Sequence, residues 1–221
     1  MNLLVIGDED NAEECRQKFG ATHSYIHKGS THDVGAGFDS CDVVFDFLPE
    51  PGPDSFECYN DVSAPVFFNT SKISLLQLLN AGALRSGNHR FGFAGLPSFL
   101  NREVLEVSLH RMDDRGKLET ICGALGTAFQ TVEDRVGLVT PRVICMIINE
   151  AYCTVEEGTA SREDVDLAMK LGTNYPFGPF EWCRKIGIRH VYELLKAVYA
   201  DTQDERYAIS PLLERECSTQ L

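Results

Sequence analysis

The first half of the chain holds four short apolar runs, each stopped by glycine, proline or a polar cluster. They are residues 3–6, 43–47, 66–68 and 91–93. Runs of this length are typical of parallel strands that are buried on both faces. Residues 11–19 and 75–83 between them can form helices, with Asp10 or Asn11 as the first N-cap, and residues 22–26 form a plausible further strand. This alternation predicts a mostly parallel α/β sheet.

From Gly137 the pattern changes to helical periodicity. Apolar residues between 143 and 155 mark one face of a long helix that Gly158 can end. Ser161 is a natural N-cap for the next helix, and residues 175–181 read as a turn that opens another. We therefore expect an α/β domain over residues 1–135 and an all-α domain over residues 136–221.

The charge and the cysteines limit the class of protein. The 33 acidic residues outnumber the 20 Lys and Arg, for a net charge of -13. A field of this sign disfavours nucleic acid and anionic membranes as partners. No apolar run approaches the ~20 residues of a membrane span. The eight cysteines show no metal-binding spacing, so we expect reduced thiols in a soluble, cytoplasmic protein.

The first turn can be compared with the glycine pattern of dinucleotide-binding sites. That pattern requires glycines for the turn, for the approach of the pyrophosphate and for helix–strand packing. Here these positions are Gly7, Glu9 and Ala12. Gly7 and Ala12 suit their places, whereas Glu9 puts a negative charge where the pyrophosphate should lie. We therefore favour a strand–turn–helix that binds no dinucleotide.

Three histidines, His23, His27 and His32, lie close together in the sequence, and Asp33 follows the last of them. A metal site is conceivable, but this spacing matches no strong ligand pattern. A surface loop is the interpretation that we favour, and we expect no metal.

Several segments of the second half resemble, in this order, the C-terminal domain of the 3-hydroxyacyl-CoA dehydrogenase family. They are residues 149–151, 157–160, 163–166, 168–172, 175–181, 186–187 and 210–213. The resemblance implies an N-terminal Rossmann-like domain that binds NAD and an all-α C-terminal domain that mediates dimerisation. It also implies that this chain is a shortened member, because the segment between the second strand and Asp42 is reduced to roughly a loop.

The resemblance continues upstream and assigns site residues. Residues 42–50, which end in Glu50, are similar to a family strand that reads "DLVIEAVPE", and residues 69–71 are similar to the family's "NTS". By this resemblance Ser71 contacts the substrate, and Gly7 and Glu50 lie on the cofactor side. The family's orienting glutamate corresponds to Glu106.

The family's catalytic histidine, twelve residues before that glutamate, falls on Ala94. Its substrate-contacting asparagine falls on Pro141. Of the family's groups Ser71 and Glu106 remain, while the general base is missing. His89, five positions before Ala94, is a possible but unfavoured substitute that would require a shifted alignment.

Three hypotheses follow for the function. The first is a catalytically impaired family member that binds an acyl-CoA-like or other ligand without hydride transfer, and with no tightly bound cofactor. The second is an active NAD-dependent 3-hydroxyacyl-CoA dehydrogenase of fatty acid metabolism with displaced catalytic residues. The third is a homodimeric interaction protein without a small ligand. We favour the first, and expect a homodimer through the helical domain.

Overall fold

The computed structural model describes residues 1–49, 56–81 and 89–219 of the chain. These fall into two compact units, Met1–Leu138 and Val139–Leu221. The first is an α/β unit and the second is helical, which confirms the predicted fold class. The two units are described separately below.

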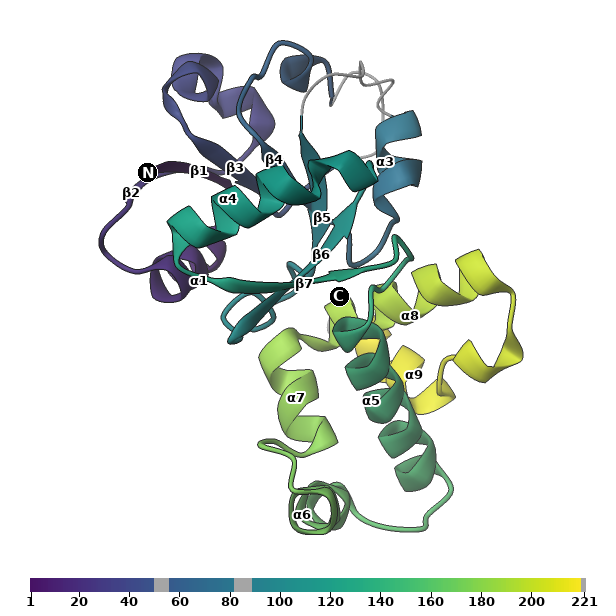
Figure 1. Cartoon of the computed structure of the whole chain (residues 1–221). Helices are drawn as coiled ribbons and strands as arrows, with labels where there is room; N and C mark the ends of the chain where they lie inside the picture. Colours follow the sequence, from purple (N-terminus) through teal and green to yellow (C-terminus); the bar gives the residue numbers. More distant parts are fainter. Residues whose placement is uncertain (50–55, 82–88, 220–221) are drawn as a thin grey trace. The chain divides into compact units, whose positions relative to one another are not determined.

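The described part of unit 1 is built on a seven-stranded sheet in the order β2-β1-β3-β4-β5-β6-β7 (Figure 1). The strands are β1 (Asn2–Ile6), β2 (Ser24–Lys28), β3 (Val43–Asp46), β4 (Val66–Asn69), β5 (Arg90–Phe93), β6 (Val104–Leu109) and β7 (Ala128–Val132). Strands β1 to β5 are parallel, β6 is antiparallel to β5, and β7 is parallel to β6. The sheet is therefore mostly parallel, as predicted.

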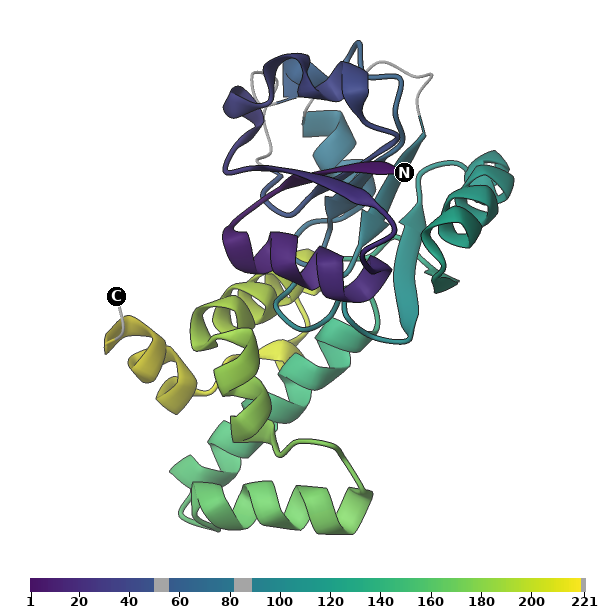
Figure 2. The same ribbon diagram turned by 90° about the vertical axis from the view of Figure 1, so that its left-hand side faces the viewer.

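Helices cover both faces of this sheet. The helices in the described part of unit 1 are α1 (Glu9–Phe19), η1 (Thr31–Asp33), η2 (Gly35–Ser40), η3 (Glu57–Tyr59), α3 (Leu75–Ala81), η4 (Met112–Asp114) and α4 (Arg115–Leu125). Buried side chains of α1 and α4 pack on one face, and those of α3 and of the segment that carries η3 pack on the other. Figure 2 shows α1 and the short helices that follow β2 on opposite sides of β1 and β2. The reduced segment before Asp42 thus consists of two 3-10 helices.

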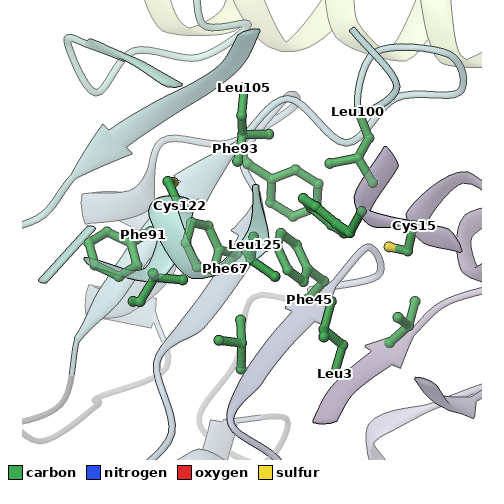
Figure 3. Packing of buried hydrophobic residues seen from close by; sticks show 14 of the residues in the cluster. Leu3, Cys15, Phe45, Phe67, Phe91, Phe93, Leu100, Leu105, Cys122 and Leu125 are labelled. Atoms are coloured by element: carbon green, nitrogen blue, oxygen red, sulfur yellow. The ribbon is translucent and has the colours of Figure 1, made fainter. Parts of the chain in front are cut away.

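Phenylalanines form the centre of the core on the face that α1 and α4 cover (Figure 3). Phe45, Phe67 and Phe91 are paired across β3, β4 and β5, and consecutive ring centroids lie 4.8 Å apart. The ring of Phe93 meets that of Phe45 edge-on at 5.5 Å. Aromatic pairs at these distances stabilise a core by about 0.5–1.5 kcal/mol beyond the area that they bury. This ladder fixes the middle strands against one another.

Two local expectations were wrong. The N-cap of α1 is Asp8, and neither Asp10 nor Asn11, because Asp8 and Asn11 bond to each other's backbone N–H in a capping box. The second strand begins at Ser24, two residues later than expected. It is an edge strand whose side chains are half-buried or exposed, so it carries no apolar run that would mark its start.

Unit 2 is all-α in its described residues. Its helices are α5 (Thr140–Glu156), α6 (Arg162–Thr173), α7 (Pro179–Ile186), α8 (Ile188–Thr202), η5 (Glu205–Tyr207) and α9 (Pro211–Thr219). Ser161 caps α6 as predicted, by accepting a hydrogen bond from Asp164 N–H. The buried Asn149 amide on α5 donates to the Ala208 carbonyl at 2.9 Å and accepts from Ser210 N–H, which fixes the turn before α9. Among the described residues no helix is long and apolar enough to cross a membrane.

Candidate functional site

The carboxyl ends of β1, β3, β4 and β5 meet at one edge of the sheet in unit 1. Open α/β sheets bind their ligands at this edge. Gly7 follows β1, Ser71 follows β4 and Ala94 follows β5, so the fold brings these sequence-predicted positions to a common edge. The following paragraphs describe what each of them contacts.

The turn after β1 leads into the amino end of α1, where the side chains of the chain itself occupy the backbone donors. Asp8 Oδ1 accepts from Asn11 N–H at 2.8 Å, and Asn11 Oδ1 accepts from Asp8 N–H at 3.0 Å. A Cβ atom on Gly7 would lie 2.4 Å from Asn11 Oδ1, so this turn requires glycine to accommodate the capping side chain. Two of the backbone donors at this helix end thus already bond a carboxylate and an amide, in a turn that also carries Glu9 and Asp10.

His27 on β2 lies across the same turn. One ring nitrogen, Nε2, lies 2.9 Å from the Gly7 carbonyl oxygen, and the other, Nδ1, lies 3.2 Å from Glu9 Oε2. Since the ring contacts both Gly7 and Glu9, it holds Glu9 against the end of β2. A surface loop, the interpretation that the sequence favoured for His27, was wrong, because His27 lies on the edge strand β2 and contacts the turn after β1.

Asn69, the last residue of β4, joins three strand ends. Its Nδ2 donates to the Phe47 carbonyl at 3.2 Å and to the Gly95 carbonyl at 3.4 Å. Its Oδ1 accepts from Gly95 N–H at 3.1 Å and from the Ser71 hydroxyl at 2.7 Å. The Ser71 hydroxyl is buried, and it donates its hydrogen bond to Asn69. Ser71 is therefore part of a structural clamp in this molecule.

Ala94 and Glu106 flank the last pair of the β5–β6 register. Gly92 pairs with Ser108 and Phe93 pairs with Val107, where the pairing ends; Ala94 is the residue after Phe93, and Glu106 is the residue before Val107. Side chains alternate along a strand, so Glu106 on β6 faces away from the side of the sheet that Val107 faces. This register is compatible with the spacing from the family resemblance, which predicts residues 94 and 106 as neighbours. Ala94 is buried and brings only a methyl group to this place.

The loop that follows Ala94 is anchored to α1. Leu96, Phe99 and Leu100 are buried, and Asn101 N–H donates to Glu14 Oε1 at 3.2 Å. Burial raises the pKa of the Glu14 carboxyl, although hydrogen bonds from loop amides oppose the shift. These contacts hold the loop against the helix.

His89 lies at the opposite end of β5. It immediately precedes Arg90, the first residue of the strand, and its Nδ1 lies 2.8 Å from Asp114 Oδ1. A strand rises about 3.3 Å per residue, so His89 and Ala94 lie roughly 16 Å apart along it. The structure therefore does not bring His89 to Glu106.

A cavity of about 170 Å³ opens beside the ends of β2 and β3. Its lining comprises Gly29, Ser30, Thr31, His32, Asp46, Leu48, Phe56 and Tyr59. The buried Asp46 carboxylate accepts from the Tyr59 hydroxyl at 2.8 Å and from Leu48 N–H at 2.9 Å. Burial and the Asp46 charge together raise the pKa of Tyr59, so this hydroxyl stays protonated.

Two sequence-predicted positions lie elsewhere. Glu50 falls outside the described residues. Pro141 is in unit 2, at the first turn of α5, where proline is well tolerated because its missing N–H would have no partner within the helix. In the described ranges no group of three or more His, Cys, Asp or Glu could hold a metal ion.

Comparison with known proteins identifies the family to which this chain is similar. Residues 137–220 match the sequence profile of the 3-hydroxyacyl-CoA dehydrogenase C-terminal domain. The mitochondrial hydroxyacyl-coenzyme A dehydrogenase of Mus musculus is 32% identical over 163 residues, which cover 71% of this chain and 52% of that protein. The chain belongs to the 3-hydroxyacyl-CoA dehydrogenase family.

Other members of the family share parts of the chain. The 3-hydroxyadipyl-CoA dehydrogenase of Escherichia coli is 37% identical over 90 residues, which cover 41% of this chain and 19% of that protein. The chain thus spans only about a fifth to about half of the length of these two curated relatives. The crystal structure of (S)-3-hydroxybutyryl-CoA dehydrogenase PaaH1 from Ralstonia eutropha superimposes with a TM-score of 0.74 at 19% identity, over 99% of this chain and 94% of that one. This likeness shows the fold.

Sequence reasoning named Asn11 and Asn69 but missed the contacts by which they shape the site. Asn11 carried a signal, because an aspartate followed three residues later by a side chain with an acceptor suggests a reciprocal cap. Asn69 carried none, since its bonds to Phe47 and Gly95 span 22 and 26 residues of sequence.

Proposed function

We propose that this chain is a catalytically impaired member of the family that binds an acyl-CoA-like ligand without transferring hydride. The observation that carries the proposal is the β5–β6 register. It supports Ala94 as the neighbour of Glu106, where the family resemblance implies a histidine base. A methyl group cannot accept the proton that leaves a 3-hydroxyl, and loss of a general base typically lowers a rate about 10²–10⁴-fold.

The amino end of α1 supports the same proposal from the cofactor side. A pyrophosphate there would meet Asp8, Glu9 and Asp10, and two backbone donors of the turn, Asp8 N–H and Asn11 N–H, are already bonded. Two like charges a few ångströms apart repel by a few kcal/mol at an effective dielectric near 20. NAD therefore binds in the millimolar range or weaker, and no cofactor is held tightly.

An acyl-CoA-like ligand is the class that the relatives suggest. Their names specify 3-hydroxyadipyl-CoA and 3-hydroxybutyryl-CoA, which share the CoA thioester. Glu106 corresponds to the family's orienting glutamate, whereas the position of its histidine is Ala94. A binding function that no longer needs proton transfer accounts for this combination.

Two measurements on the full chain test the proposal. Absorbance of NADH with 3-hydroxybutyryl-CoA and NAD is expected to show no turnover, whereas about 1 s⁻¹ or more, an ordinary enzymatic rate, would refute impairment. Thermal unfolding with acetoacetyl-CoA is expected to show a raised Tm, because a ligand that binds only the folded state stabilises it. An unchanged Tm at about 1 mM would favour an interaction protein without a small ligand.

A further inference from the structure

A second cavity, of about 310 Å³, lies within unit 2. It is formed by side chains from α5, α6, α7 and α9 and by the turn between α7 and α8. Its side-chain lining comprises Tyr152, Arg162, Phe180, Cys183, Arg184 and Glu216. All of them belong to unit 2, and none was assigned a role in hydride transfer. The cavity is therefore independent of the site in unit 1.

One wall of the cavity is a fixed ion pair over two aromatic rings. The Arg162 guanidinium bonds the Glu216 carboxylate and lies over the Tyr152 and Phe180 rings, 5.3 and 5.0 Å from their centroids. The Tyr152 hydroxyl also donates to Glu216, at 3.3 Å. Arg162 therefore neutralises the negative charge of Glu216, and the contacts hold both side chains in place.

The floor of the cavity is apolar and uncharged. Phe180 and Tyr152 pack with their ring centroids 5.0 Å apart, and Cys183 lies 3.7 Å from the Tyr152 hydroxyl. Burial raises the pKa of both the Cys183 thiol and the Tyr152 hydroxyl, so neither carries a charge near neutral pH. Aromatic rings and an uncharged thiol are the kind of lining on which an apolar ligand body packs, and the charge of Arg162 beside them is already paired with Glu216.

The Arg184 guanidinium carries a positive charge that its ion pair with Asp166 neutralises only in part. Its side chain is 69% exposed, and its ion pair with Asp166, at 3.7 Å, is longer than a hydrogen bond. Asp166 already accepts from Phe180 N–H at 2.7 Å, at the amino end of α7. Among the lining residues two arginines and one glutamate carry charge, and Asp166 offsets part of the Arg184 charge. Because the exposed Arg184 guanidinium lies too far from Asp166 for a hydrogen bond, its N–H donors can reach a ligand in the cavity.

The start of α8 also lines the cavity, through Gly187 and Ile188. Gly187 is at once the C-cap of α7 and the N-cap of α8. The partial negative charge of the α7 carboxyl end and the partial positive charge of the α8 amino end therefore meet at this glycine, and we assign the recognition of an anion to Arg184 alone.

We propose that this cavity binds a small amphipathic carboxylate. The apolar body lies on Phe180 and Tyr152, and the carboxylate bonds the Arg184 guanidinium. This inference goes beyond the proposed function, because it concerns a second site in the helical unit. Neither loss nor retention of dehydrogenase activity affects it.

Calorimetric titration of the full chain tests the ligand class. The probe is 3-phenylpropionate, compared with 3-phenylpropanol and 3-phenylpropylamine, which share its apolar body. We expect the carboxylate to bind with a submillimolar Kd, the alcohol at least about tenfold more weakly, and the amine not measurably. No heat from the carboxylate up to about 10 mM, or equal affinity for the alcohol, overturns the proposal.

A matched pair of variants tests the residue assignment. Arg184→Gln is expected to weaken 3-phenylpropionate binding about tenfold or more. Lys185→Gln removes the same charge from the next residue of α7, whose Nζ lies 4.5 Å from the Phe177 ring centroid and which does not line the cavity, so it should leave the affinity unchanged. Both side chains are exposed enough to be replaced without loss of the fold, which fluorescence of Trp182 would verify. Equal effects of the two substitutions would leave only a general charge effect and overturn the assignment.

Discussion

At the scale of single residues, the Asn69 amide joins the ends of three strands of unit 1. Replacing it by alanine removes the acceptor of the Ser71 hydroxyl and of Gly95 N–H. Each buried polar group left without a partner costs about 1–3 kcal/mol, so Asn69→Ala should lower the free energy of unfolding by about 2–4 kcal/mol in urea denaturation. Ser71→Ala, which removes one of these bonds, is the control and should lose clearly less. Equal losses would contradict the clamp.

A second prediction at this scale concerns Ala94. Restoring histidine there should place an imidazole beside Glu106, yet we expect Ala94→His alone to give no measurable oxidation of 3-hydroxybutyryl-CoA. The acidic first turn of α1 still opposes NAD, and Pro141 still stands where the resemblance implies an asparagine. NADH absorbance under saturating substrate is the measurement. Turnover by this single variant would show that the base was the only missing element.

At the scale of elements, the acidic residues at the amino end of α1 have two effects. Asp8 caps the helix, and the charges of Asp8 and Glu9 oppose the binding of NAD. Asp8→Ala should destabilise the protein by about 1 kcal/mol, as loss of an N-cap usually does. The combined change Asp8→Ser and Glu9→Gly keeps a capping hydroxyl and removes two charges, so NAD affinity in calorimetry should rise at least about tenfold. A Kd for NAD of about 10 µM or tighter in the unaltered protein would contradict this account.

The start of α7 gives a prediction about pH. Hydrogen bonds to Glu181 from Lys170 and from Gly178 N–H lower the pKa of its carboxyl below the ordinary 4.5. A lowered carboxyl pKa contributes stability that is present above pH 4.5 and is lost as the pH falls through the folded-state pKa. Thermal unfolding followed by fluorescence of Trp182, the single tryptophan of the chain, should show this loss. Glu181→Gln should flatten the dependence in that window, while Glu163→Gln, on an exposed face of α6, should leave it unchanged.

The elements also show which features sequence patterns can predict. Strands β1, β3, β4 and β5 were predicted because they are buried on both faces and so carry apolar runs. The start of β2 was misplaced because an edge strand has no such run. The N-cap of α1 was misplaced because Asp8, Asp10 and Asn11 all suit that role, and only the three-dimensional turn selects among them. For the site, resemblance could assign Ala94 and Glu106, whereas the Asn69 contacts depend on a register that no local pattern records.

At the scale of the whole molecule, we propose a homodimer through unit 2. Four large apolar side chains of this unit are about half or more exposed: Val139, Val143, Leu167 and Leu171. Asp166 is the only buried residue recorded for α6, so this helix leaves apolar surface uncovered. Sedimentation equilibrium at micromolar concentration should give twice the chain mass of 24.6 kDa. Leu171→Glu should shift the mass toward the monomer, and a monomeric mass for the unaltered chain would contradict the proposal.

The capping carboxylate of Asp8 also has a consequence for the stability and lifetime of this protein in a cell. A nucleotide-dependent fold draws part of its stability from the pool of its cofactor, so its abundance follows metabolic state by mass action. Here the Asp8 carboxylate caps the amino end of α1, and under the proposed function no diphosphate is held there. The carboxylate at this helix end is part of the chain and is therefore always present. Its lifetime should therefore stay the same whether the surrounding nicotinamide nucleotides are plentiful or depleted.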